Sequence, residues 1–331
     1  MARKVILDVD TGSDDAVAIM TAALSPDIDL VAVCTVWGNK DIEKTTQNTL
    51  DLVSALGIDV PVYKGCDTAM VKFLAEAYVP LIRRPPVYKD GELIEMHSDT
   101  LGLPHSDRLA ESIPAAMFYV NYLRSAKEPV TLVPVGPLTN LGLAFRIAPD
   151  IVRNVEEIVI MGGGCLVTNM SPCAESNIWN DPEAAHIVQS SGAKIVYVSL
   201  DATHRAVVTK DDCKRFRELN NFAGTFAAKE CEQRIIMHTA EQPLEVPDSA
   251  SVHDALCIAY LIDPTVITDL RYVHVEIGLG GFGAGQTIVD PRNYVGGQNA
   301  YFSFNADRFK FADILYDCFR RDTNPPIHAE N

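Results

Sequence analysis

The sequence has 331 residues, of which 47% are hydrophobic and 22% are charged, a composition typical of a globular protein with a sizeable core. Aspartate and glutamate total 44 against 28 lysines and arginines, so the formal net charge is −16. A surface that acidic repels phosphate backbones and anionic lipids, which argues against nucleic acid and membrane surfaces as partners.

Short runs of β-branched residues alternate with helical patterns along most of the chain. Strands are expected at Lys4–Val9, Asp29–Val36, Val130–Val135, Glu157–Met161 and Lys194–Leu200. Helices are expected at Asp14–Leu24, Asp41–Leu56, Pro137–Ala148 and Pro182–Gln189. This alternation, with apolar strands, predicts an α/β fold: an open, mostly parallel, twisted sheet flanked by helices on both faces.

The last third of the chain has a different pattern. It predicts helices at Ser251–Ile262 and Asp307–Arg320, and strands at Tyr272–Gly278 and Gln286–Val289. No linker or repeat interrupts the sequence, so we expect one domain over residues 1–331, with 321–331 as a loose polar tail. The least regular stretch, Cys66–Arg108, is longer than a plain connection and is interpreted as a functional loop.

The N-terminus and the cysteines indicate the compartment. Asp8 and Asp10 interrupt the first apolar stretch too early for a secretory signal, and no later stretch approaches the length of a membrane span. The eight cysteines are scattered and form no Cys-x-x-Cys pair, which indicates reduced thiols, with neither a disulfide framework nor a zinc site. We therefore expect a cytoplasmic protein.

Four carboxylates, those of Asp8, Asp10, Asp14 and Asp15, stand at the end of the first expected strand and in the turn after it. Open parallel sheets bind ligands outside the carboxyl ends of their strands, where this turn lies. Helix capping would account for Asp14 or Asp15, but period-two alternation places Asp8 and Asp10 together on one side of the strand. Crowded carboxylates raise one another's pKa unless a cation neutralises them, and oxygen ligands suit calcium or magnesium. We therefore favour a metal site over capping alone.

Later segments carry groups that suit the same site, and each also has a simpler explanation. The carbonyl of Val135, at a strand end, could bind a hard cation, or its segment is a plain strand-to-helix connection. Asp254 is either a metal ligand or an ordinary residue of the first helical turn. Its neighbour His253 is either structural or an acid or base near its working pH. His204, which also follows a strand, is interpreted as structural.

A glycine run, Gly162-Gly163-Gly164, follows another strand and leads into a polar loop with Asn169, Glu175 and Asn177. A triple glycine can be only a flexible turn. Amides and a carboxylate beyond a strand end are also the groups that recognise sugar hydroxyls, since they accept or donate hydrogen bonds. From the residues alone the two interpretations stand equal.

In their order along the chain, these segments resemble the inosine–uridine-preferring nucleoside hydrolase family. The first-strand motif Asp8-Val9-Asp10-Thr11-Gly12-Ser13-Asp14-Asp15 is that family's signature. The further matching segments are Gly38-Asn39, Gly136–Asn140, Met161–Gly164, Ala174–Asn177, Asp181–His186, Leu200–His204 and Val252–Asp254. The match runs from about Lys4 to Arg320, and the ordered set is more specific than any one motif.

The resemblance implies the nucleoside hydrolase fold, with a Rossmann-like core, and an enzyme that cleaves the N-glycosidic bond of a small-molecule ribonucleoside to ribose and free base. Calcium would be held by Asp10, Asp15, Asp254 and the Val135 carbonyl, together with a water and the ribose 2′- and 3′-hydroxyls. Asp10 would be the general base that deprotonates this water, and the sugar would pass through an oxocarbenium-like transition state. The resemblance also implies a homodimer or homotetramer.

The resemblance also assigns the remaining site residues. Asp14 and Asn177 would bind ring hydroxyls with Asn39 nearby, Asn169 and Glu175 would reach the 5′-hydroxyl side, Met161 would pack near the ribose, and His97 would meet the substrate from its loop. His253 would be the acid that protonates the departing base.

Three departures from the family pattern bear on substrate preference. Histidine at the position of His253 is typical of members that accept pyrimidine nucleosides or a broad range, so a pyrimidine or broad base preference is expected. The family's His-Gly-rich loop is altered at Met96–Leu103, and an insertion at Ala77–Glu95 precedes it. Ser176 replaces an aromatic residue. These changes lie near base or 5′-side recognition and leave the metal site untouched.

Three alternatives remain. A phosphatase of the haloacid dehalogenase type also has Asp-x-Asp after its first strand and would be phosphorylated at Asp8, but its later lysine and acidic pair have no convincing match here. A non-catalytic nucleoside-binding protein on the same fold would have no need of the general base Asp10. A hydrolase of another ribosyl substrate fits the altered loops.

Overall fold

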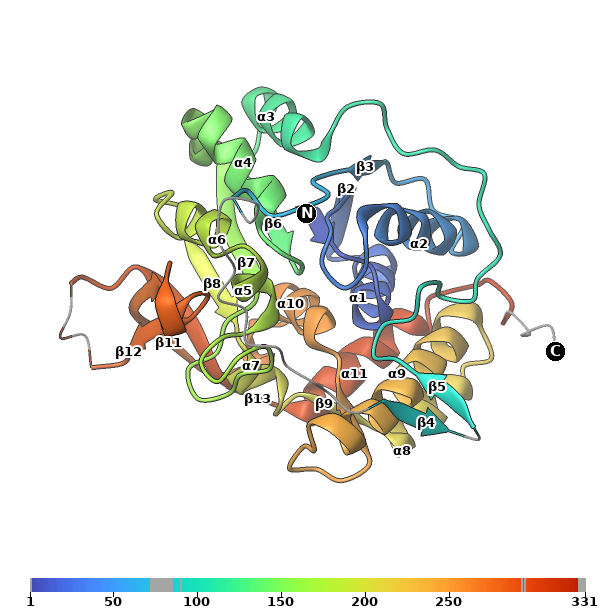
Figure 1. Ribbon diagram of the computed structural model, residues 1–331. Coiled ribbons are helices and arrows are strands. Elements are labelled where there is room, and N and C mark those ends of the chain that lie inside the picture. Colours follow the sequence, from blue (N-terminus) through green and yellow to red (C-terminus); the bar gives the residue numbers. More distant parts are fainter. Residues whose placement is uncertain (1, 72–85, 90, 293, 295, 327–331) are drawn as a thin grey trace.

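The computed structural model describes residues 2–71, 86–89, 91–292, 294 and 296–326. In this part of the chain, nine strands form one sheet in the order β12-β11-β13-β8-β7-β6-β1-β2-β3 (Figure 1). The strands are β1 (Arg3–Val9), β2 (Ile28–Thr35), β3 (Val62–Lys64), β6 (Val130–Pro134), β7 (Val155–Met161), β8 (Ile195–Val198), β11 (Ile267–Ile277), β12 (Thr287–Asp290) and β13 (Ala300–Ala306). Neighbouring strands from β3 to β13 are parallel, while β11 and β12 are antiparallel to their neighbours. The predicted α/β fold with a mostly parallel sheet is confirmed.

The strand order reverses beside β1. From β1 the chain passes outward to β2 and β3, and it later returns to β6 and continues outward through β7 and β8 on the other side. The helix after β1, α1 (Ser13–Leu24), covers one face of the sheet, and the helix after β6, α4 (Thr139–Ile147), covers the other. The two connections therefore diverge beyond the carboxyl ends of β1 and β6, and open α/β sheets bind ligands at such a point.

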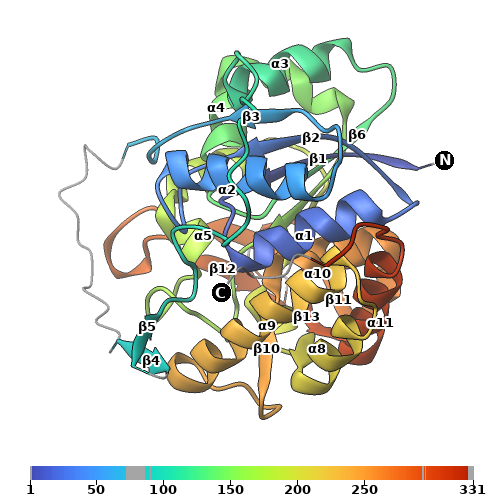
Figure 2. The ribbon, with the colours of Figure 1, turned by 90° about the vertical axis from the view of Figure 1, so that its right-hand side faces the viewer.

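The alternating side chains of β1 divide the core into two layers. Val5, Leu7 and Val9 pack on the face covered by α1, α2 (Ile42–Ala55), α9 (Phe222–Glu241), α10 (His253–Ile262) and α11 (Arg308–Phe319). Ile6 packs on the face covered by α3 (Ala115–Ser125), α4 and α6 (Pro182–Gln189), as Figure 2 shows for α3 and α4 above the sheet. These side chains of β1 are fully buried, and each such burial contributes about 1.5–3 kcal/mol. Helices thus cover both faces, as predicted.

Several elements were not predicted from the sequence. They are α3, α5 (Ser176–Asn180), α7 (Leu200–Thr203), β9 (Val207–Thr209), α8 (Lys210–Arg217), α9, β10 (Ser249–Ser251), β3 and β13. The strand expected at Lys194–Leu200 ends at Val198, because Ser199 precedes the short helix α7 as its N-terminal cap. Among the described helices, none is long and apolar enough to cross a membrane.

The long irregular segment before α3 contains a small antiparallel hairpin, β4 (Val87–Lys89) and β5 (Glu92–Ile94). Residues 72–85 and 90 lie outside the described residues, so the insertion expected at residues 77–95 falls partly outside them. Beyond the hairpin, residues 95–101 run toward α9, where Lys229 donates to the Leu101 carbonyl at 2.9 Å.

The chain after α11 does not form the loose tail that we expected. Asp322 is buried, and its Oδ2 accepts a hydrogen bond from the backbone N–H of Ala223 at 2.7 Å. Asn324 donates from its side chain to the Leu56 carbonyl at 2.9 Å. The expectation is therefore wrong for this part of the tail, because Asp322 satisfies an N–H at the start of α9 that lacks a partner within the helix. Residues 327–331 lie outside the described residues.

Replacing Asp322 with alanine is expected to lower the free energy of unfolding by about 1–3 kcal/mol, because the Ala223 N–H would lose its buried acceptor. Asp317→Ala is the matched control, since the ion pair of Asp317 with Arg320 is exposed and such pairs contribute about 0–1 kcal/mol. Urea unfolding measures both variants. Equal losses of stability would contradict the role assigned to Asp322.

Candidate active site

A cavity of about 980 Å³ opens beyond the carboxyl ends of β1 and β6, a size suited to a small-molecule ligand. Eleven of the predicted site residues line it: Asp10, Asp14, Asn39, His97, Val135, Met161, Asn169, Glu175, Asn177, His253 and Asp254. The remaining predicted residue, Asp15, is fully buried and is hydrogen-bonded to the backbone N–H of Asp10 at 3.1 Å. The fold therefore brings together residues that are scattered over most of the sequence.

Asp10 occupies a space that two glycines leave open. A Cβ on Gly38 would overlap the carboxylate of Asp10, and one on Gly136 would lie 2.8 Å from its Oδ1. The backbone N–H of Asn39 donates to Asp10 Oδ2 at 2.7 Å, and the Asn39 side chain donates to the Asp10 carbonyl at 3.2 Å. The turns after β1, β2 and β6 thus hold one carboxylate between them.

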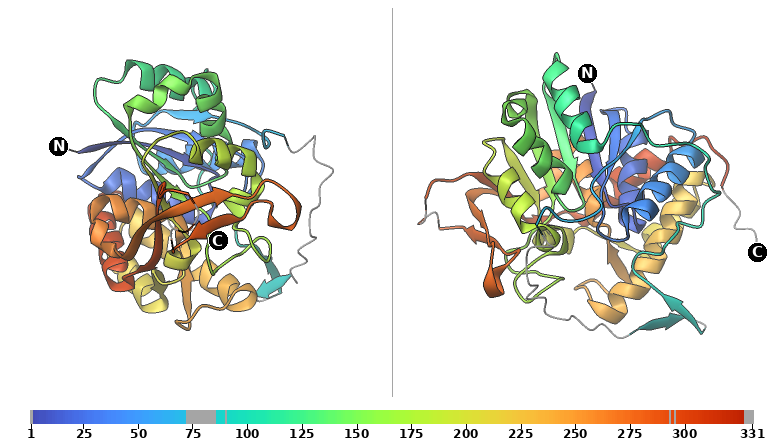
Figure 3. Two further views of the ribbon diagram at one scale, coloured as in Figure 1. Left: turned by 90° about the vertical axis from the view of Figure 1, so that its left-hand side faces the viewer. Right: turned by 45° about the horizontal axis from the view of Figure 1, so that its top comes forward.

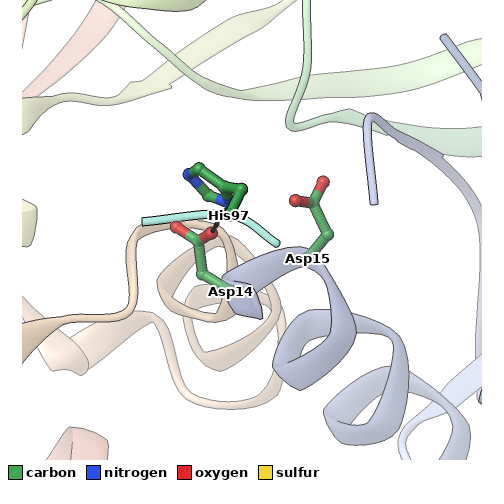
Figure 4. Close-up of side chains that lie close together, drawn as sticks. All are labelled: Asp14, Asp15 and His97. Carbon is green, nitrogen blue, oxygen red and sulfur yellow. Dashed lines mark ion pairs between the residues drawn. The ribbon is translucent and has the colours of Figure 1, made fainter. Parts of the chain in front are cut away.

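Asp14 and Asp15, in the first turn of α1, have different partners. Asp15 accepts from the backbone N–H groups of Asp10 and Gly12, the latter at 2.9 Å, so capping accounts for part of its placement. Asp14 pairs with the guanidinium of Arg234 at 2.9 Å. Figure 4 shows the two carboxylates beside His97, and one ligand atom of each of these three residues lies within 4.8 Å of the other two. Among the described residues, this group has the spacing of a metal site.

The carboxylates of the cavity are crowded. Burial raises the pKa of Asp10 well above its usual value, and the charge of Asp15 raises it further. Burial also raises the pKa of Asp254, and the charges of Asp14 and Asp15 add to the effect. Among the described residues that line the cavity, Arg234 is the one arginine or lysine. The carboxylates thus outnumber their positive partners, and their oxygens suit a hard cation such as calcium.

Arg234 was not identified from the sequence. It lies on α9 and is 1% exposed, and it donates from Nη1 to Ser13 Oγ and Asp14 Oδ1, each at 2.9 Å. Its Nε donates to the Ser251 carbonyl at 2.9 Å. The sequence offers one signal for it: this arginine directly precedes three apolar residues, beginning with Ile235, in a stretch without proline. A buried arginine almost always has a charged or hydrogen-bonding partner.

The loop after β7 is held by hydrogen bonds at the edge of the cavity. The side-chain nitrogen of Asn177 donates to the carbonyls of Val135, at 2.7 Å, and Met161, at 3.0 Å. Because these bonds use both amide protons, Asn177 Oδ1 is the atom that can accept from a ligand. Glu175 accepts from the backbone N–H of Asn177 at 2.8 Å and that of Gly163 at 3.0 Å, and burial raises its pKa.

Three histidines, His204, His238 and His253, gather beside the cavity with ring centroids 5.7 to 6.3 Å apart. Burial lowers the pKa of His204 to about 4 and that of His238 to about 3. Burial, and then the charge of Arg234, hold the pKa of His253 well below its usual value. The role of His253 as an acid or base near its working pH stays a prediction, and the direction of this shift makes its protonated ring a stronger acid than a free imidazolium. His238 lines the cavity from α9 and was also missed from the sequence.

His97 is placed by contacts on both sides of its loop. A Cβ on Gly12 would overlap the His97 ring, so the turn after β1 packs directly against it. Lys40 pairs with Asp99 at 2.9 Å, and Gln233 of α9 donates to the Glu95 carbonyl at 2.8 Å. The altered loop at residues 96–103 therefore spans from the start of α2 to α9.

Asp8 does not belong to the cavity, although the alternation of the first strand places it with Asp10. Tyr119 donates to Asp8 Oδ2 at 2.9 Å, and Asn140 donates to Oδ1 at 3.1 Å. Burial raises the pKa of Asp8 to about 7, while these hydrogen bonds act in the opposite direction. Because β1 ends at Val9, the alternation does not extend to Asp10. Asp8 instead joins the sheet to α3 and α4.

Comparison with known proteins gives a consistent result. The family model described as "inosine-uridine preferring nucleoside hydrolase" matches residues 5–313. The chain is 36% identical over 322 residues to pyrimidine-specific ribonucleoside hydrolase RihB of Escherichia coli (strain SE11), covering 96% of this chain and 97% of that protein. It is 37% identical over 337 residues to the inosine-uridine preferring nucleoside hydrolase of Leishmania major, covering 98% and 100%. A solved structure, the purine-preferring ribonucleoside hydrolase from Gardnerella vaginalis, superposes with a TM-score of 0.82 at 28% identity, covering 96% of this chain and 98% of that one.

Arg234→Met is expected to lower the free energy of unfolding by about 3–5 kcal/mol, because the buried Asp14 carboxylate would lose its cation. Arg124→Met is the control, since Arg124 and Asp150 form an exposed pair worth about 0–1 kcal/mol. Urea denaturation measures the free energy of unfolding of both variants. If Arg234→Met costs no more stability than Arg124→Met, Arg234 does not balance the buried aspartates.

Proposed function

The chain belongs to the inosine-uridine preferring nucleoside hydrolase family and hydrolyses ribonucleosides, and we propose that it does so with Asp10 as general base and calcium as cofactor. The proposed ligands of the ion are Asp10, Asp15, Asp254 and the Val135 carbonyl. The observation that carries this proposal is the burial of three carboxylates beside one cavity, with pKa values raised by burial and by the charges of neighbouring aspartates. The products are ribose and a free base.

The family is metal-dependent in general, and the oxygen donors of this cavity are those that calcium prefers. Asp14 and His97 also lie within metal-binding distance of Asp15, but Asp14 already pairs with Arg234. We therefore assign the ion to the set that contains Asp254. When bound, calcium would supply positive charge that aligns the ribose 2′- and 3′-hydroxyls with a water and makes that water easier to deprotonate.

Asp10 is proposed to accept the proton of the attacking water. Burial and the neighbouring aspartates raise the pKa of Asp10, whereas a bound ion would act in the opposite direction and keep its carboxylate ionised and able to accept a proton. The hydrogen bond from the Asn39 N–H and the close approach of Gly38 and Gly136 fix the orientation of the carboxylate. A base held in one orientation loses little freedom when the water binds.

The ribose is proposed to bind between two groups of polar side chains. Asp14, Asn39 and Asn177 would meet the ring hydroxyls, Asn169 and Glu175 would meet the 5′-hydroxyl, and Met161 would pack against the ring. Arg234 orients Asp14, and the two carbonyls bound by Asn177 orient its amide. These side chains can therefore hold the sugar in one position.

The negative charge of the cavity favours the transition state. Departure of the base leaves positive charge on the sugar ring, as in other glycoside cleavage. Buried carboxylates interact with such a charge more strongly than exposed ones, because water does not screen them. They interact much less with the neutral nucleoside, so the cavity stabilises the transition state more than the substrate.

His253 is proposed to protonate the departing base. Its Nδ1 lies 2.7 Å from the Thr203 hydroxyl, and burial lowers its pKa, which makes the protonated ring a stronger acid than a free imidazolium. In the protonated ring both nitrogens are donors, so Nδ1 would donate to Thr203 while Nε2 gives its proton to the departing base. We propose a pyrimidine or broad base preference. The relatives named above carry pyrimidine-specific, inosine-uridine preferring and purine-preferring names, which a broad preference accommodates.

The phosphatase alternative is excluded by family membership. The structure adds a physical reason, because Asp8, the residue that would be phosphorylated, is 2% exposed and bonded to Tyr119 and Asn140.

The direct test is ribose release from inosine, adenosine, guanosine, uridine and cytidine, each with and without a calcium chelator. We expect chelation to abolish release and added calcium to restore it. Asp10→Ala is expected to lower turnover about 10²–10⁴-fold, the usual contribution of a general base. Asp8→Asn, two residues away and outside the cavity, is the matched control and should keep its turnover. Circular dichroism checks that each variant is folded.

Each part of the proposal can fail separately. Near-normal turnover by Asp10→Ala would show that Asp10 is not the general base. Ribose release that continues in the presence of the chelator would show that the reaction does not need calcium. Restoration of release by magnesium but not by calcium would identify the ion as magnesium. No release from any of the five nucleosides by folded, calcium-loaded protein would overturn the proposed substrate class.

His253→Ala is expected to slow hydrolysis of the best natural nucleoside about 10²-fold, because the base would depart without a proton. Hydrolysis of p-nitrophenyl riboside should change little, since its leaving group is stable as an anion. Steady-state rates on both substrates make the comparison. Equal losses on the two would show that His253 acts on the sugar or the fold and not on the leaving group.

A further inference from the structure

Thr287 stands on β12, at the edge of the sheet, yet its side chain is 2% exposed. Figure 3 shows the ribbon of β11 and β12 projecting outward from the rest of the sheet. The Thr287 hydroxyl accepts from the backbone N–H of Gly164 and donates to the carbonyl of the same residue, both at 2.9 Å. We propose that Thr287 is a positioning residue for the 5′ side of the ribose, acting through the glycine turn that binds Glu175.

The contact between Thr287 and the glycine turn is steric as well as polar. Gly163 has a φ of +74°, in the left-handed region that favours glycine. A Cβ on Gly163 would lie 2.6 Å from the Thr287 methyl carbon. The methyl and the hydroxyl of one threonine therefore fix two consecutive residues of the turn.

The turn passes this restraint on to Glu175. The backbone N–H of Gly163 donates to Glu175 Oε2 at 3.0 Å, so Thr287 and Glu175 bind adjacent residues of the turn. Glu175 is 2% exposed and lines the cavity. The Glu175 carboxylate also accepts from the backbone N–H groups of Asn177 and Ile178, so a displaced Gly163 would withdraw one of its buried donors and loosen the carboxylate at Oε2.

Asp201, at the start of α7, supports the next part of the same turn. Its two oxygens accept from the backbone N–H groups of Cys165, at 2.6 Å, and Leu166, at 2.9 Å. The Leu166 side chain is 87% exposed and does not anchor the turn by packing. The backbone N–H of Leu200 also donates to the Gly163 carbonyl at 2.9 Å, so Thr287 and Asp201 supply side-chain hydrogen bonds to the turn that single substitutions can remove.

This inference rests on the proposed function, because that proposal assigns the 5′-hydroxyl to Glu175. Asp10 is held by other turns, those after β1, β2 and β6. Loss of the Thr287 hydroxyl should therefore weaken the 5′ contact and leave the proton transfer at Asp10 intact. The kcat/KM for a substrate without a 5′-hydroxyl should therefore be unaffected by this loss.

The test compares Thr287→Val with the wild type on two substrates: the ribonucleoside that the wild type cleaves fastest and its 5′-deoxy counterpart. Thr287→Val is expected to lower kcat/KM for the ribonucleoside about tenfold, because the contact between Glu175 and the 5′-hydroxyl would weaken by about the value of one hydrogen bond. For the 5′-deoxy compound, kcat/KM should stay within about twofold of the wild type. Thr287→Ser keeps the hydroxyl and should restore most of the activity on the ribonucleoside.

Thr131→Val is the matched control. Thr131 lies on β6 and is also buried, but its hydroxyl has no hydrogen-bond partner among the described residues, so both substrates should be unaffected. Equal losses on the two substrates in Thr287→Val, or none on either, would overturn the inference. If Thr287→Val does not fold, Asp201→Asn replaces it and should show the same selective loss. Failure of the proposed function is distinguishable, because the wild type itself would then release no ribose.

Discussion

Asp10, Asp15 and Asp254 are buried beside one cavity, and the repulsion between their charges is the constraint on which the rest of the site depends. Removing a carboxylate from water is costly unless donors or positive charge replace the solvent. Backbone N–H groups supply hydrogen-bond donors to Asp10 and Asp15, and Arg234 supplies one positive charge to the neighbouring Asp14. The remaining excess of negative charge is what makes a bound cation favourable, and any ligand that binds only the folded state also stabilises it.

The sheet determines where this charge is placed. At β1 the strand order reverses, so the turns after β1, β2 and β6 converge on a space that none of the described helices fills. Gly38 and Gly136 make the convergence possible, because a side chain at either would meet the Asp10 carboxylate. Asp10 is therefore held where three strand ends meet, and Asp15 and Asp254 lie in the first turns of α1 and α10. Asn169 and Glu175, proposed to meet the 5′-hydroxyl, come from the loop after β7, and His253, proposed to meet the base, lies beside Asp254 on α10.

This division explains what could be predicted from the sequence. The turn after β1 carries Asp10, Asp14 and Asp15 within a few residues of a regular strand, so local periodicity locates them. Arg234 and its partner Asp14 are 220 residues apart, and nothing local connects them. The helix α9 that carries Arg234 buries residues on several sides, so it shows no single apolar stripe. Asp8 was misplaced for a similar reason: its partners Tyr119 and Asn140 are more than one hundred residues away.

The two halves of the site are supported independently, and this bears on how one fold serves different substrates. Bonds among the first turns hold Asp10, whereas β12 and α7 support the glycine turn that binds Glu175, and Thr203 of α7 contacts His253. A substitution in the second set can change which nucleoside fits without altering the carboxylates that bear on the glycosidic bond. Relatives similar to this chain along almost their whole length carry names with different base preferences, as such an arrangement permits. Because energetic effects add when residues share no partners, changes in the two halves should combine nearly independently.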